Sequence, residues 1–454
     1  MMNKEPSSFR DPDSLLEFDA IFYYRKISTN YLPHYLHFKK SGLKDRLITE
    51  GYILSFEEIV DEKPDVGFAN EVLRTEKIPF VSYPYEWSFS QLKTAALLTL
   101  KINLIALECG MILKDSSAYN IQFIGSKVIF IDIASFEIYK IDSVWIGYQQ
   151  FCKHFLAPLL LSSYKDVRLT KLLLTNLDGI DLSFTRKLLP IWSFLNSGVF
   201  LHLVLNSIGI KSKNKNNKTI KLKESALRSI IVHLTSTIKN LKIGNKDSEW
   251  LNYYNRTNYS DAGLLQKLII IETFIEGLKI KTALDIGAND GKFSALLSKK
   301  SIYTVSTDID ELAIEQNFIN ARKDDNANLL SLHLNFANPT PAIGWDNTER
   351  KSFFGRADFD IVLALAVIHH FVITYDLTFE MIAERFSKLG KYLIIEFPFP
   401  EDEKVEIISR TKHVQFSRYN IENFKRAFEK YFNELDSKFV ETNNRIIFLY
   451  GTKD

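Results

Sequence analysis

One stretch in the carboxyl-terminal half of the chain, residues 282–294, restricts the choice of fold more than any other. Residues 281–286 have the apolar content of a buried strand, and Asp285 lies near its carboxyl end. Gly287 and Gly291 follow, and glycine permits a sharp backbone turn and lets a ligand approach without meeting a Cβ atom. The stretch therefore predicts a strand, a tight turn and a helix whose amino end is directed at the turn.

The spacing of the glycines indicates which class of ligand such a turn can bind. A dinucleotide site uses Gly-x-Gly-x-x-Gly, and a P-loop uses Gly-x-x-x-x-Gly-Lys-Ser/Thr. This turn has Asp-x-Gly-x-x-x-Gly, with one glycine where the dinucleotide turn needs two and no lysine placed for a phosphate. A cofactor without phosphate groups suits this turn better than the ligands of those two motifs do. An ordinary strand–helix turn that binds no ligand is the alternative.

The stretch resembles the first motif of class I S-adenosylmethionine (SAM)-dependent methyltransferases. Residues 302–310 form a second apolar strand that ends in acidic residues. The spacing between Gly291 and Asp308 fits a βαβ unit in which a terminal acid binds a ribose diol, because a carboxylate accepts from both hydroxyls. The resemblance implies that Asp308 binds the SAM ribose and that Ile309 packs on the adenine. Asp310 is the weaker candidate for the ribose.

The resemblance also implies contacts from the neighbouring strands. Asn335 and Phe336 follow a third predicted strand, where members of the family hold the adenine with a polar side chain and a neighbouring backbone amide. Asn335 departs from the pattern, since Asp is commoner there, and a turn cap is the alternative. The predicted cofactor contacts are Asp285, Gly287, Asn289, Gly291, Asp308, Ile309, Asn335, Phe336 and Leu363.

Candidate catalytic residues follow the fourth and fifth predicted strands. The fourth, residues 358–365, is continuously apolar, which predicts a buried parallel strand, and ligands bind outside the carboxyl ends of such strands. His369 and His370 are therefore candidate general bases, because imidazole titrates near neutrality. The alternative is that one caps a turn and the other is buried. Glu396, at the end of the fifth strand, is predicted to face the substrate.

Two further patterns narrow the resemblance. Residues 338–345 contain Asn-Pro-x-Pro followed by Gly-Trp, and residues 363–371 contain Ala-Leu-Ala-Val-Ile-His-His. Together they are similar to the methyltransferases related to the rhizobial nodulation protein NoeA, which implies a sugar or other small hydroxylated acceptor. The fourth strand is not followed by Asn/Asp-Pro-Pro-Tyr/Phe, which argues against a DNA-adenine or glutamine methyltransferase. Tyr254 and Tyr259 precede the first strand, where many family members have a segment that covers the cofactor; simple packing is the alternative.

The amino-terminal half carries a second, weaker resemblance. Asp115 and Asn120, followed by Asp132 at a strand end, resemble the catalytic loop and metal-binding aspartate of protein kinases and aminoglycoside phosphotransferases. There the acid lies by the acceptor hydroxyl, and an Asn and an Asp bind Mg²⁺. No His-Arg precedes Asp115, Ile-Ala follows Asp132, and no glycine-rich loop lies upstream. A degenerate kinase-like region, reused as a scaffold or for substrate binding, is predicted; active phosphotransfer and a chance spacing are the alternatives.

Three regions are expected along the chain. Residues 1–140 form an α+β kinase-like region, residues 141–245 form a helical region of the same domain, and residues 246–454 form the methyltransferase domain. The predicted fold class is α/β. A seven-stranded, doubly wound, Rossmann-like sheet that ends in an antiparallel hairpin follows a mixed α+β, helix-rich amino-terminal domain.

Composition excludes several other classes. With 57 basic and 55 acidic residues, the net charge of +2 gives no general attraction for nucleic acid or an anionic membrane. Two cysteines without a Cys-x-x-Cys pattern indicate neither a disulfide framework nor a zinc site, and no metal is predicted. Residues 95–112 are apolar but are interrupted by Lys101 and Glu108, which favours a buried helix over a membrane span. A soluble, cytoplasmic protein without a membrane or nucleic-acid partner is expected.

The expected function is methyl transfer from SAM to a small hydroxylated acceptor, such as a carbohydrate, with the amino-terminal domain used for substrate binding or scaffolding. Three other functions remain open at this point. One is a non-catalytic SAM-binding scaffold, and another is phosphotransfer by the amino-terminal half. The third is methylation of RNA, which requires a basic face that only the lysine-rich residues 211–223 provide.

Overall fold

The computed structural model describes residues 2–205, 221–243, 261–412, 418–440 and 444–453. Tyr254, Tyr259 and the lysine-rich run 211–218 lie outside the described residues. The chain divides into two compact units. The first unit contains Met1–Ile124, Val128–Lys246 and Ala342–Arg350, and the second contains Gly125–Lys127, Asp247–Pro341 and Lys351–Asp454.

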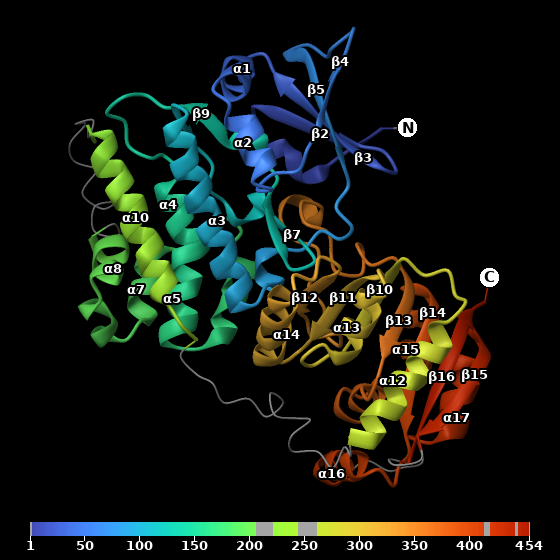
Figure 1. Cartoon of the computed structure of the whole chain (residues 1–454). Helices are drawn as coiled ribbons and strands as arrows, with labels where there is room; N and C mark the ends of the chain where they lie inside the picture. Colours follow the sequence, from blue (N-terminus) through green and yellow to red (C-terminus); the bar gives the residue numbers. More distant parts are fainter. Residues whose placement is uncertain (1, 206–220, 244–260, 413–417, 441–443, 454) are drawn as a thin grey trace. The chain divides into compact units, whose positions relative to one another are not determined.

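A seven-stranded sheet forms the centre of the second unit (Figure 1). Its order is β12, β11, β10, β13, β14, β16, β15, and β16 runs antiparallel to both of its neighbours while the other pairs are parallel. This is the strand order of the class I methyltransferase fold, so the predicted fold class is confirmed. The strands are β10 (Thr282–Ile286), β11 (Tyr303–Asp308), β12 (Leu329–His333), β13 (Phe359–Ala364), β14 (Gly390–Pro398), β15 (Phe432–Val440) and β16 (Arg445–Thr452).

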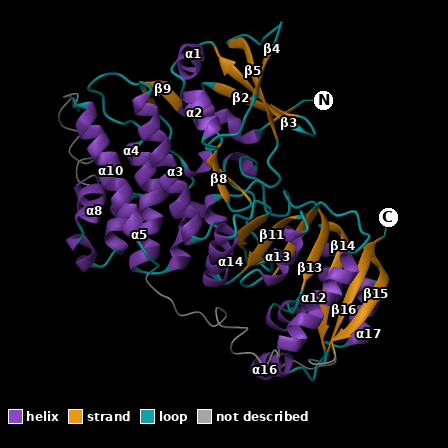
Figure 2. Ribbon diagram, viewed as in Figure 1, coloured by secondary structure: helices purple, strands orange, loops and turns teal. Residues whose placement is uncertain are grey.

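Helices pack on this sheet (Figure 2). They are α12 (Asp261–Ile275), α13 (Lys292–Lys299), α14 (Glu311–Lys323), α15 (Phe379–Ser387) and α17 (Ile421–Phe428), while α16 (Glu403–Lys412) packs against the turn at residues 370–374. Polar side chains start several of them: Asp310 caps α14, Thr378 caps α15 and Asn420 caps α17 by accepting from backbone N–H groups of the first turn.

The hydrophobic core between α12, α13 and the sheet fixes which strand residues face those helices. Ile270 and Ile271 of α12 pack in one cluster with Leu363 of β13 and Ile394 of β14. Side chains alternate between the two faces of a strand, so the residues two positions away from Leu363 and Ile394 face α12 as well. Burial of each such side chain contributes about 1.5–3 kcal/mol to the stability of the unit.

The first unit begins with an antiparallel sheet of order β1, β2, β3, β5, β4. Its strands are β1 (Asn3–Lys4), β2 (Ser14–Phe18), β3 (Phe22–Ser28), β4 (Glu57–Val60) and β5 (Phe68–Glu76). Helices α1 (Leu32–Lys40) and α2 (Leu43–Thr49) connect β3 to β4. The predicted mixed α+β character of this part of the chain is confirmed.

A long helix, two small sheets and a helical region complete the first unit. The helix α3 (Phe89–Glu108) begins at Ser88, whose side chain accepts from the N–H of Gln91. Strand β6 (Met111–Leu113) pairs with β9 (Phe136–Ile138), and β7 (Ile121–Ile124) pairs with β8 (Lys127–Phe130). The remaining helices are α4 (Tyr148–Phe151), α5 (Ala157–Tyr164), α6 (Leu172–Thr175), α7 (Leu182–Leu188), α8 (Ser197–Val199) and α10 (Glu224–Asn240).

The segment Ala342–Arg350 belongs to the first unit although the chain on either side of it belongs to the second. The buried carboxylate of Glu349 accepts from Nε of Arg10 at 2.8 Å, and the guanidinium of Arg350 lies 4.3 Å from the centre of the Tyr119 ring. The sequence prediction assigned this segment to the methyltransferase domain. The observed division differs from the predicted boundary because Glu349 and Arg350 make their ionic and ring contacts with residues of the first unit.

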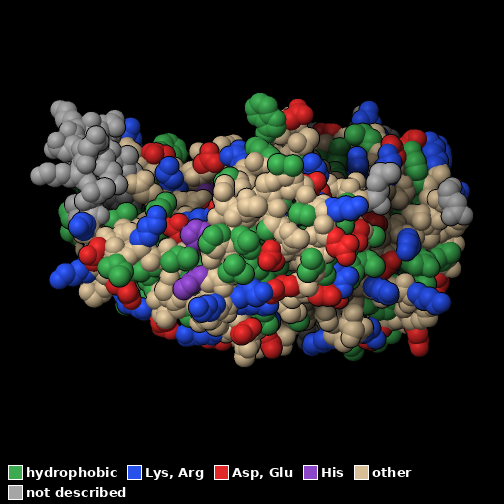
Figure 3. Space-filling model, turned by 90° about the horizontal axis from the view of Figure 1, so that it is seen from above, with side chains coloured by type: hydrophobic (Ala, Val, Ile, Leu, Met, Phe, Trp, Pro, Cys, Tyr) green, Lys and Arg blue, Asp and Glu red, His purple; other side chains and the backbone are tan. Residues whose placement is uncertain are grey.

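The exterior of the described chain carries both signs of charge. The face drawn in Figure 3 has Lys and Arg side chains interspersed with Asp and Glu. Cys109 and Cys152 are free thiols. No helix in the described ranges combines the length and the apolar character needed to cross a bilayer.

Candidate active site

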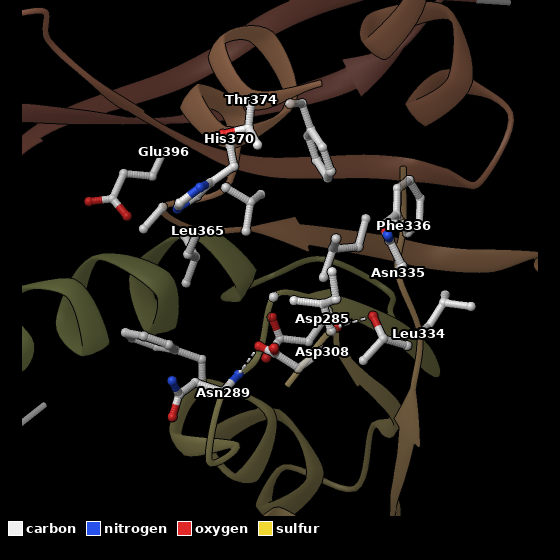
Figure 4. Close-up of a pocket in the computed structure, with 18 of the residues that line it drawn as sticks. Asp285, Asn289, Asp308, Leu334, Asn335, Phe336, Leu365, His370, Thr374 and Glu396 are labelled. Atoms are coloured by element: carbon white, nitrogen blue, oxygen red, sulfur yellow. Dashed lines mark hydrogen bonds between the residues drawn. The ribbon is translucent and has the colours of Figure 1, made fainter. Parts of the chain in front are cut away.

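A cavity of about 330 Å³ lies at the carboxyl ends of the parallel strands of the second unit (Figure 4). Residues that end or follow β10, β11, β12, β13 and β14 line it, together with residues of α12. Its volume lies at the lower end of the range of small-molecule sites, and its position is the one at which open α/β sheets bind ligands. The site predicted from the sequence motif and this cavity are in the same place.

Gly287 gives the turn after β10 its shape. Its φ is 72°, in the left-handed region that favours glycine, and a Cβ atom there would lie 2.2 Å from Cγ1 of Val367. The N–H groups of Gly287 and Ala288 donate to the carbonyl of Thr307 at 2.8 and 3.0 Å. The turn is thereby fastened to β11, and its backbone forms one wall of the cavity.

Gly291, unlike Gly287, is needed for the packing of two helices and not for the wall of the cavity. It has a φ of 84° and precedes α13, and a Cβ atom there would lie 2.4 Å from Oδ1 of Asn317 on α14. Asn317 in turn donates to Oγ of Ser306 at 2.6 Å. The residue therefore allows α13 and α14 to approach each other, and it does not line the cavity.

Asp308 presents a carboxylate at one end of the cavity. Its Oδ2 accepts from the N–H of Asn289 at 2.8 Å, and its Oδ1 accepts from the N–H of Asp310 at 2.9 Å. Burial raises the pKa of Asp308 above its ordinary value, although both N–H donors act in the opposite direction. Each oxygen has a second lone pair, so the oriented carboxylate can still accept from two hydroxyls of a ligand.

Asp285 lies at the end of the neighbouring strand and is only 2% exposed. Its Oδ2 accepts from the hydroxyl of Ser294 at 2.5 Å. Burial, with a smaller contribution from the negative charge of Asp308, raises the pKa of Asp285 to about 7. A cationic group bound beside Asp285 would stabilise its charged form.

Asn335, Phe336 and Ile309 line the cavity around Asp308. Oδ1 of Asn335 accepts from the N–H of Ala337 at 2.9 Å, so this side chain also caps the turn that follows β12. The ring of Phe336 packs against Phe371, with centroids 5.9 Å apart. These residues give this part of the cavity an apolar wall with one amide group.

The two adjacent histidines have different positions. His370 lines the cavity, whereas His369 is 2% exposed and does not line it; their ring centroids are 4.3 Å apart. Burial, aided by the positive charge of Arg445, lowers the pKa of His370 to about 4. Burial and the neighbouring His370 lower the pKa of His369 well below its ordinary value. Both imidazoles are therefore neutral at pH 7.

A buried ionic chain that the sequence reading did not identify lies at the same end of the cavity. Nζ of Lys267 is 2.5 Å from Oε1 of Glu396, Nη1 of Arg445 is 3.4 Å from the same oxygen, and Nε of Arg445 is 2.7 Å from Oδ2 of Asp402. Lys267 and Glu396 line the cavity. The one signal in the sequence is that Lys267 is the only charged residue from 264 to 271, where the other residues are apolar except Gln266.

Ionic contacts change the pKa values in this chain. Burial lowers the pKa of Lys267 to about 8, although Glu396 acts in the opposite direction. Burial acts to raise the pKa of Glu396, but the positive charges of Lys267 and Arg445 outweigh it, so that the pKa lies below its ordinary value. Glu396 is therefore ionised at neutral pH.

The cavity thus brings together most of the predicted site residues. Those that line it are Asp285, Gly287, Asn289, Asp308, Ile309, Asn335, Phe336, His370 and Glu396. Leu363, Gly291 and His369 do not line it. Leu363 is fully buried in the core shared with α12, because its side chain faces that helix and not the end of the strand. The other residues that line the cavity include Leu264, Lys267, Leu365, Ala366, Val367 and Tyr375.

The kinase-like residues of the first unit form an ion pair and hydrogen bonds with other residues of that unit. Nη1 of Arg25 lies 2.7 Å from Oδ1 of Asp132, and the hydroxyl of Ser135 donates to the other oxygen of that carboxylate. Nδ2 of Asn120 donates to Oγ of Ser135 at 2.9 Å, and Asp115 accepts from the N–H of Ser117 at 2.9 Å. Among the described residues, no group of three or more His, Cys, Asp or Glu side chains is arranged to hold a metal ion.

Comparison with known proteins gives one relative of similar length. No protein-family model matches the chain. The nodulation protein NoeA of Rhizobium meliloti (strain 1021) is 31% identical over 419 residues, which cover 89% of this chain and 87% of that protein.

Solved methyltransferase structures are more distant. The N-methyltransferase NodS from Bradyrhizobium japonicum WM9 is 10% identical, and the match covers 43% of this chain and 99% of that one with a TM-score of 0.31. Magnesium protoporphyrin IX methyltransferase from Synechocystis PCC 6803 with bound S-adenosylhomocysteine (SAH) is 14% identical, covering 46% and 90% with a TM-score of 0.31. These TM-scores are too low to support an assignment. The fold is assigned from the strand order of the sheet.

Proposed function

The chain belongs to the family of the nodulation protein NoeA, and we propose that it is a SAM-dependent methyltransferase that binds its cofactor and a small hydroxylated acceptor in the cavity of the second unit. The observation that supports this most is the position of the cavity between two sets of polar groups. Asp308 lies at one end, on the second strand of the βαβ unit, and Glu396 and His370 lie at the other (Figure 4).

The residues around the first end suit the parts of SAM. The Asp308 carboxylate matches the ribose diol, Ile309 and Phe336 match the adenine ring, and the amide of Asn335 matches its polar edge. Gly287 leaves room for the backbone to approach the ligand, and Asp285, with a pKa of about 7, suits a cationic amino group. Contacts of Gly291 and Leu363 with the cofactor remain predictions from the resemblance.

SAM supplies a methyl group on a positively charged sulfur, which an acceptor lone pair attacks in line while the carbon–sulfur bond breaks. The chain holds the two reactants in that alignment and excludes water from them. The carboxyl ends of β13 and β14 lie on the side of β10 away from Asp308, so His370 and Glu396 face the acceptor. His369, which packs behind His370, remains a prediction as a general base.

A hydroxyl acceptor suits the groups at this end. A neutral imidazole and an ionised carboxylate can each accept a hydrogen bond from an O–H group. The assignment of a carbohydrate follows the family resemblance. Substrate binding or scaffolding is the proposed role of the first unit, and the engagement of Asp132 with Arg25 and Ser135 favours this role over phosphotransfer.

The test of cofactor binding is titration calorimetry of the full-length protein with SAH. We expect micromolar binding to the wild type and a loss of about tenfold or more in Asp308→Ala, because hydrogen bonds to a charged group contribute about 1.5–3 kcal/mol each. Asp290→Asn is the matched control, because Asp290 belongs to the same turn but does not line the cavity, and its binding should equal that of the wild type.

A folded wild type that binds no SAH would overturn the proposal, and ATP with Mg²⁺ would then be tested in the same way. Conversion of SAM to SAH in the presence of an acceptor separates an enzyme from a SAM-binding scaffold. Binding without any conversion would support the scaffold.

A further inference from the structure

Helix α12 carries one lysine, Lys267, in a stretch whose other residues from 264 to 271 are apolar except Gln266. Lys267 is 2% exposed, and it lies one turn before Ile270 and Ile271, which pack in the core between α12 and the sheet. An ammonium group is costly to bury unless it is paired and hydrogen-bonded, so a lysine at such a position requires a specific partner. A lysine that lines a cavity and has a shifted pKa is also a candidate for a functional site.

Its partner is Glu396 on β14. Glu396 follows Ile394 by two positions, so that its side chain is on the face of the sheet that α12 covers. Oε1 of Glu396 meets Nζ of Lys267 at 2.5 Å and Nη1 of Arg445 at 3.4 Å. The side chains of Lys267 and Glu396 line the cavity, where their polar atoms can meet a bound molecule.

The other oxygen of this carboxylate has an unused hydrogen-bonding capacity. Within the described part of the chain, Oε2 of Glu396 is buried and accepts no hydrogen bond. A buried carboxylate oxygen without a donor costs free energy, and such atoms are rare unless water or a ligand supplies the donor. Because Glu396 lines the cavity, an O–H or N–H group of the bound molecule is the natural donor.

The charges at this end of the cavity are balanced without a ligand. When Lys267 is protonated, the form that predominates at neutral pH because its pKa is about 8, Lys267 and Arg445 carry two positive charges, and Glu396 and Asp402 carry two negative ones. Arg445 is held by both oxygens of Asp402, at 2.7 and 3.2 Å. A protonated amine would add a charge without a counterion here, whereas a neutral hydroxyl would not. The ionic chain therefore favours a neutral donor.

On the basis of the proposed function, we infer that the acceptor is a compound with two neighbouring hydroxyls, one of which donates to Oε2 of Glu396 while the other loses its proton to the neutral amine of Lys267. In this step the O–H bond of the second hydroxyl breaks and a new N–H bond forms on Nζ. The electron pair stays on the oxygen, which becomes the nucleophile. The resulting ammonium is stabilised by Glu396, and it later releases the proton to solvent.

Lys267 is a better proton acceptor than the other groups at this end. Its pKa of about 8 lies near neutrality, where a general base is most effective. The pKa of His370 is about 4, and the pKa of Glu396 lies below its ordinary value, so both hold a proton weakly. The charged and titratable groups around Lys267 are Glu396, Arg445, Asp402 and His369, and His370 lines the same cavity.

The first test measures the protonation of Lys267 directly. In full-length protein labelled with ¹⁵N-lysine, one side-chain resonance should titrate with a midpoint near pH 8, and that resonance should be absent from Lys267→Met. Glu272→Gln is the control, because Glu272 is an exposed residue on the same helix that pairs with Lys300 at 3.2 Å. A wild type in which every lysine titrates above about pH 10, the ordinary range, would overturn the inference.

The second test measures methyl transfer from labelled SAM to myo-inositol, mannose and glucose, with ethanolamine and propylamine as amines that lack two neighbouring hydroxyls. The wild-type rate on a polyol should rise about 25-fold between pH 6.5 and 8.5, because the neutral fraction of a lysine with a pKa of about 8 rises by that factor, and Lys267→Met should reduce the rate at least about 100-fold. Lys267→Arg keeps the positive charge beside Glu396 but cannot accept a proton, so it should be as inactive as Lys267→Met. Recovery of activity in Lys267→Arg would show a structural ion pair and would overturn the inference.

Binding of SAH distinguishes the failure of this inference from the failure of the proposed function. Lys267→Met should bind SAH with an affinity within about threefold of the wild type, and a tenfold loss would assign Lys267 to the cofactor instead. A folded wild type without SAH affinity would overturn the proposed function itself. Normal SAH binding together with transfer to the amines, or to none of the polyols, would overturn the assignment of a two-hydroxyl acceptor alone.

Discussion

Asp285 and Asp308 end two adjacent parallel strands, and burial raises the pKa of both carboxyls. For Asp285 the folded pKa is about 7, against an ordinary value of 3.8. A carboxyl group whose pKa is raised on folding stabilises the folded state below its unfolded pKa, and this contribution is lost as the pH rises through its folded pKa. The relevant window is therefore about pH 4 to 7.

We expect the substitution Asp285→Asn to change how stability depends on pH. In protein without cofactor, the free energy of unfolding of the variant relative to that of the wild type should increase from pH 4 to 7 and then stay constant. Urea unfolding at pH 4, 5.5, 7 and 8 measures it. A difference that does not change with pH would contradict the raised pKa of Asp285.

Asp360→Asn is the control of opposite sign. Burial acts to raise the pKa of Asp360, but the N–H groups of Lys281 and Thr282 and the ammonium of Lys391 outweigh it, so the pKa is lowered. Its stabilising contribution is present above the unfolded pKa and is lost as the pH falls through the folded value. The stability difference for this variant should therefore change below about pH 4 and remain constant between pH 5 and 8.

Asp310 is expected to stabilise α14 without binding the cofactor. Its Oδ1 accepts from the N–H groups of Leu312 and Ala313 at 2.8 and 3.0 Å, and it does not line the cavity. Removal of such a cap in Asp310→Ala should lower the free energy of unfolding by about 1 kcal/mol. Affinity for SAH, measured by calorimetry, should stay within about twofold of the wild type. A large loss of affinity would mean that Asp310, and not Asp308, is the ribose ligand.

The individual site residues differ in how far the sequence could predict them. Asp308 and Gly287 belong to a local motif whose spacing determines their position, and the cavity contains both. The side chain of Leu363 points into the core, because alternation along β13 decides its direction. The role of Lys267 depends on its contact with Glu396, which lies on a strand far along the chain. No local sequence pattern connects these two residues.

Among the elements of the second unit, the contact between α13 and α14 depends on Gly291. We expect Gly291→Ala to lower the free energy of unfolding by about 1–3 kcal/mol, because alanine disfavours the φ of 84° and its Cβ would meet Asn317. Denaturant unfolding followed by far-UV circular dichroism measures the change.

Gly277→Ala separates the two causes. Gly277 also has a positive φ, of 81°, but no atom lies within 4 Å of the Cβ position. Its substitution should therefore cost only the conformational part, about 1 kcal/mol. Equal losses in the two variants would show that the contact between α13 and α14 tolerates the extra atom.

Strands with continuous apolar runs could be predicted from the sequence, and helices with polar caps could be predicted with them. The strands β10 and β13 are fixed by such runs, because a buried parallel strand needs apolar residues on both faces. The π-helical turn η10 (His370–Thr374) could not be predicted, since it depends on how the chain packs after β13. It is nevertheless the element that carries His370 to the cavity.

For the chain as a whole, the salt bridge between Arg10 and Glu349 joins parts of the first unit that are far apart in sequence. We expect Arg10→Met to destabilise the attachment of Ala342–Arg350, because Glu349 is buried and loses its 2.8 Å partner. Arg10 is half exposed, so the loss should be about 1 kcal/mol. Amide hydrogen exchange of residues 342–350 should become faster by about fivefold.

The control is Asp178→Asn. Asp178 is the other acidic partner of Arg10, at 3.4 Å, and its side chain is 88% exposed. Its removal should leave the exchange of residues 342–350 unchanged, since an exposed ion pair contributes little. Unchanged exchange in Arg10→Met would show that other contacts retain the segment.

The membership of Ala342–Arg350 in the first unit bears on how the gene can change. A recombination event that joined residues 1–246 to a different methyltransferase, or residues 247–454 to a different amino-terminal region, would separate Glu349 from Arg10 and Arg350 from Tyr119. The recipient would acquire a buried carboxylate that has lost its 2.8 Å partner Arg10 and keeps only the more distant Arg350, at 3.7 Å. The two coding regions should therefore be inherited together, and a functional chimaera should require the exchange of residues 342–350 along with the amino-terminal region.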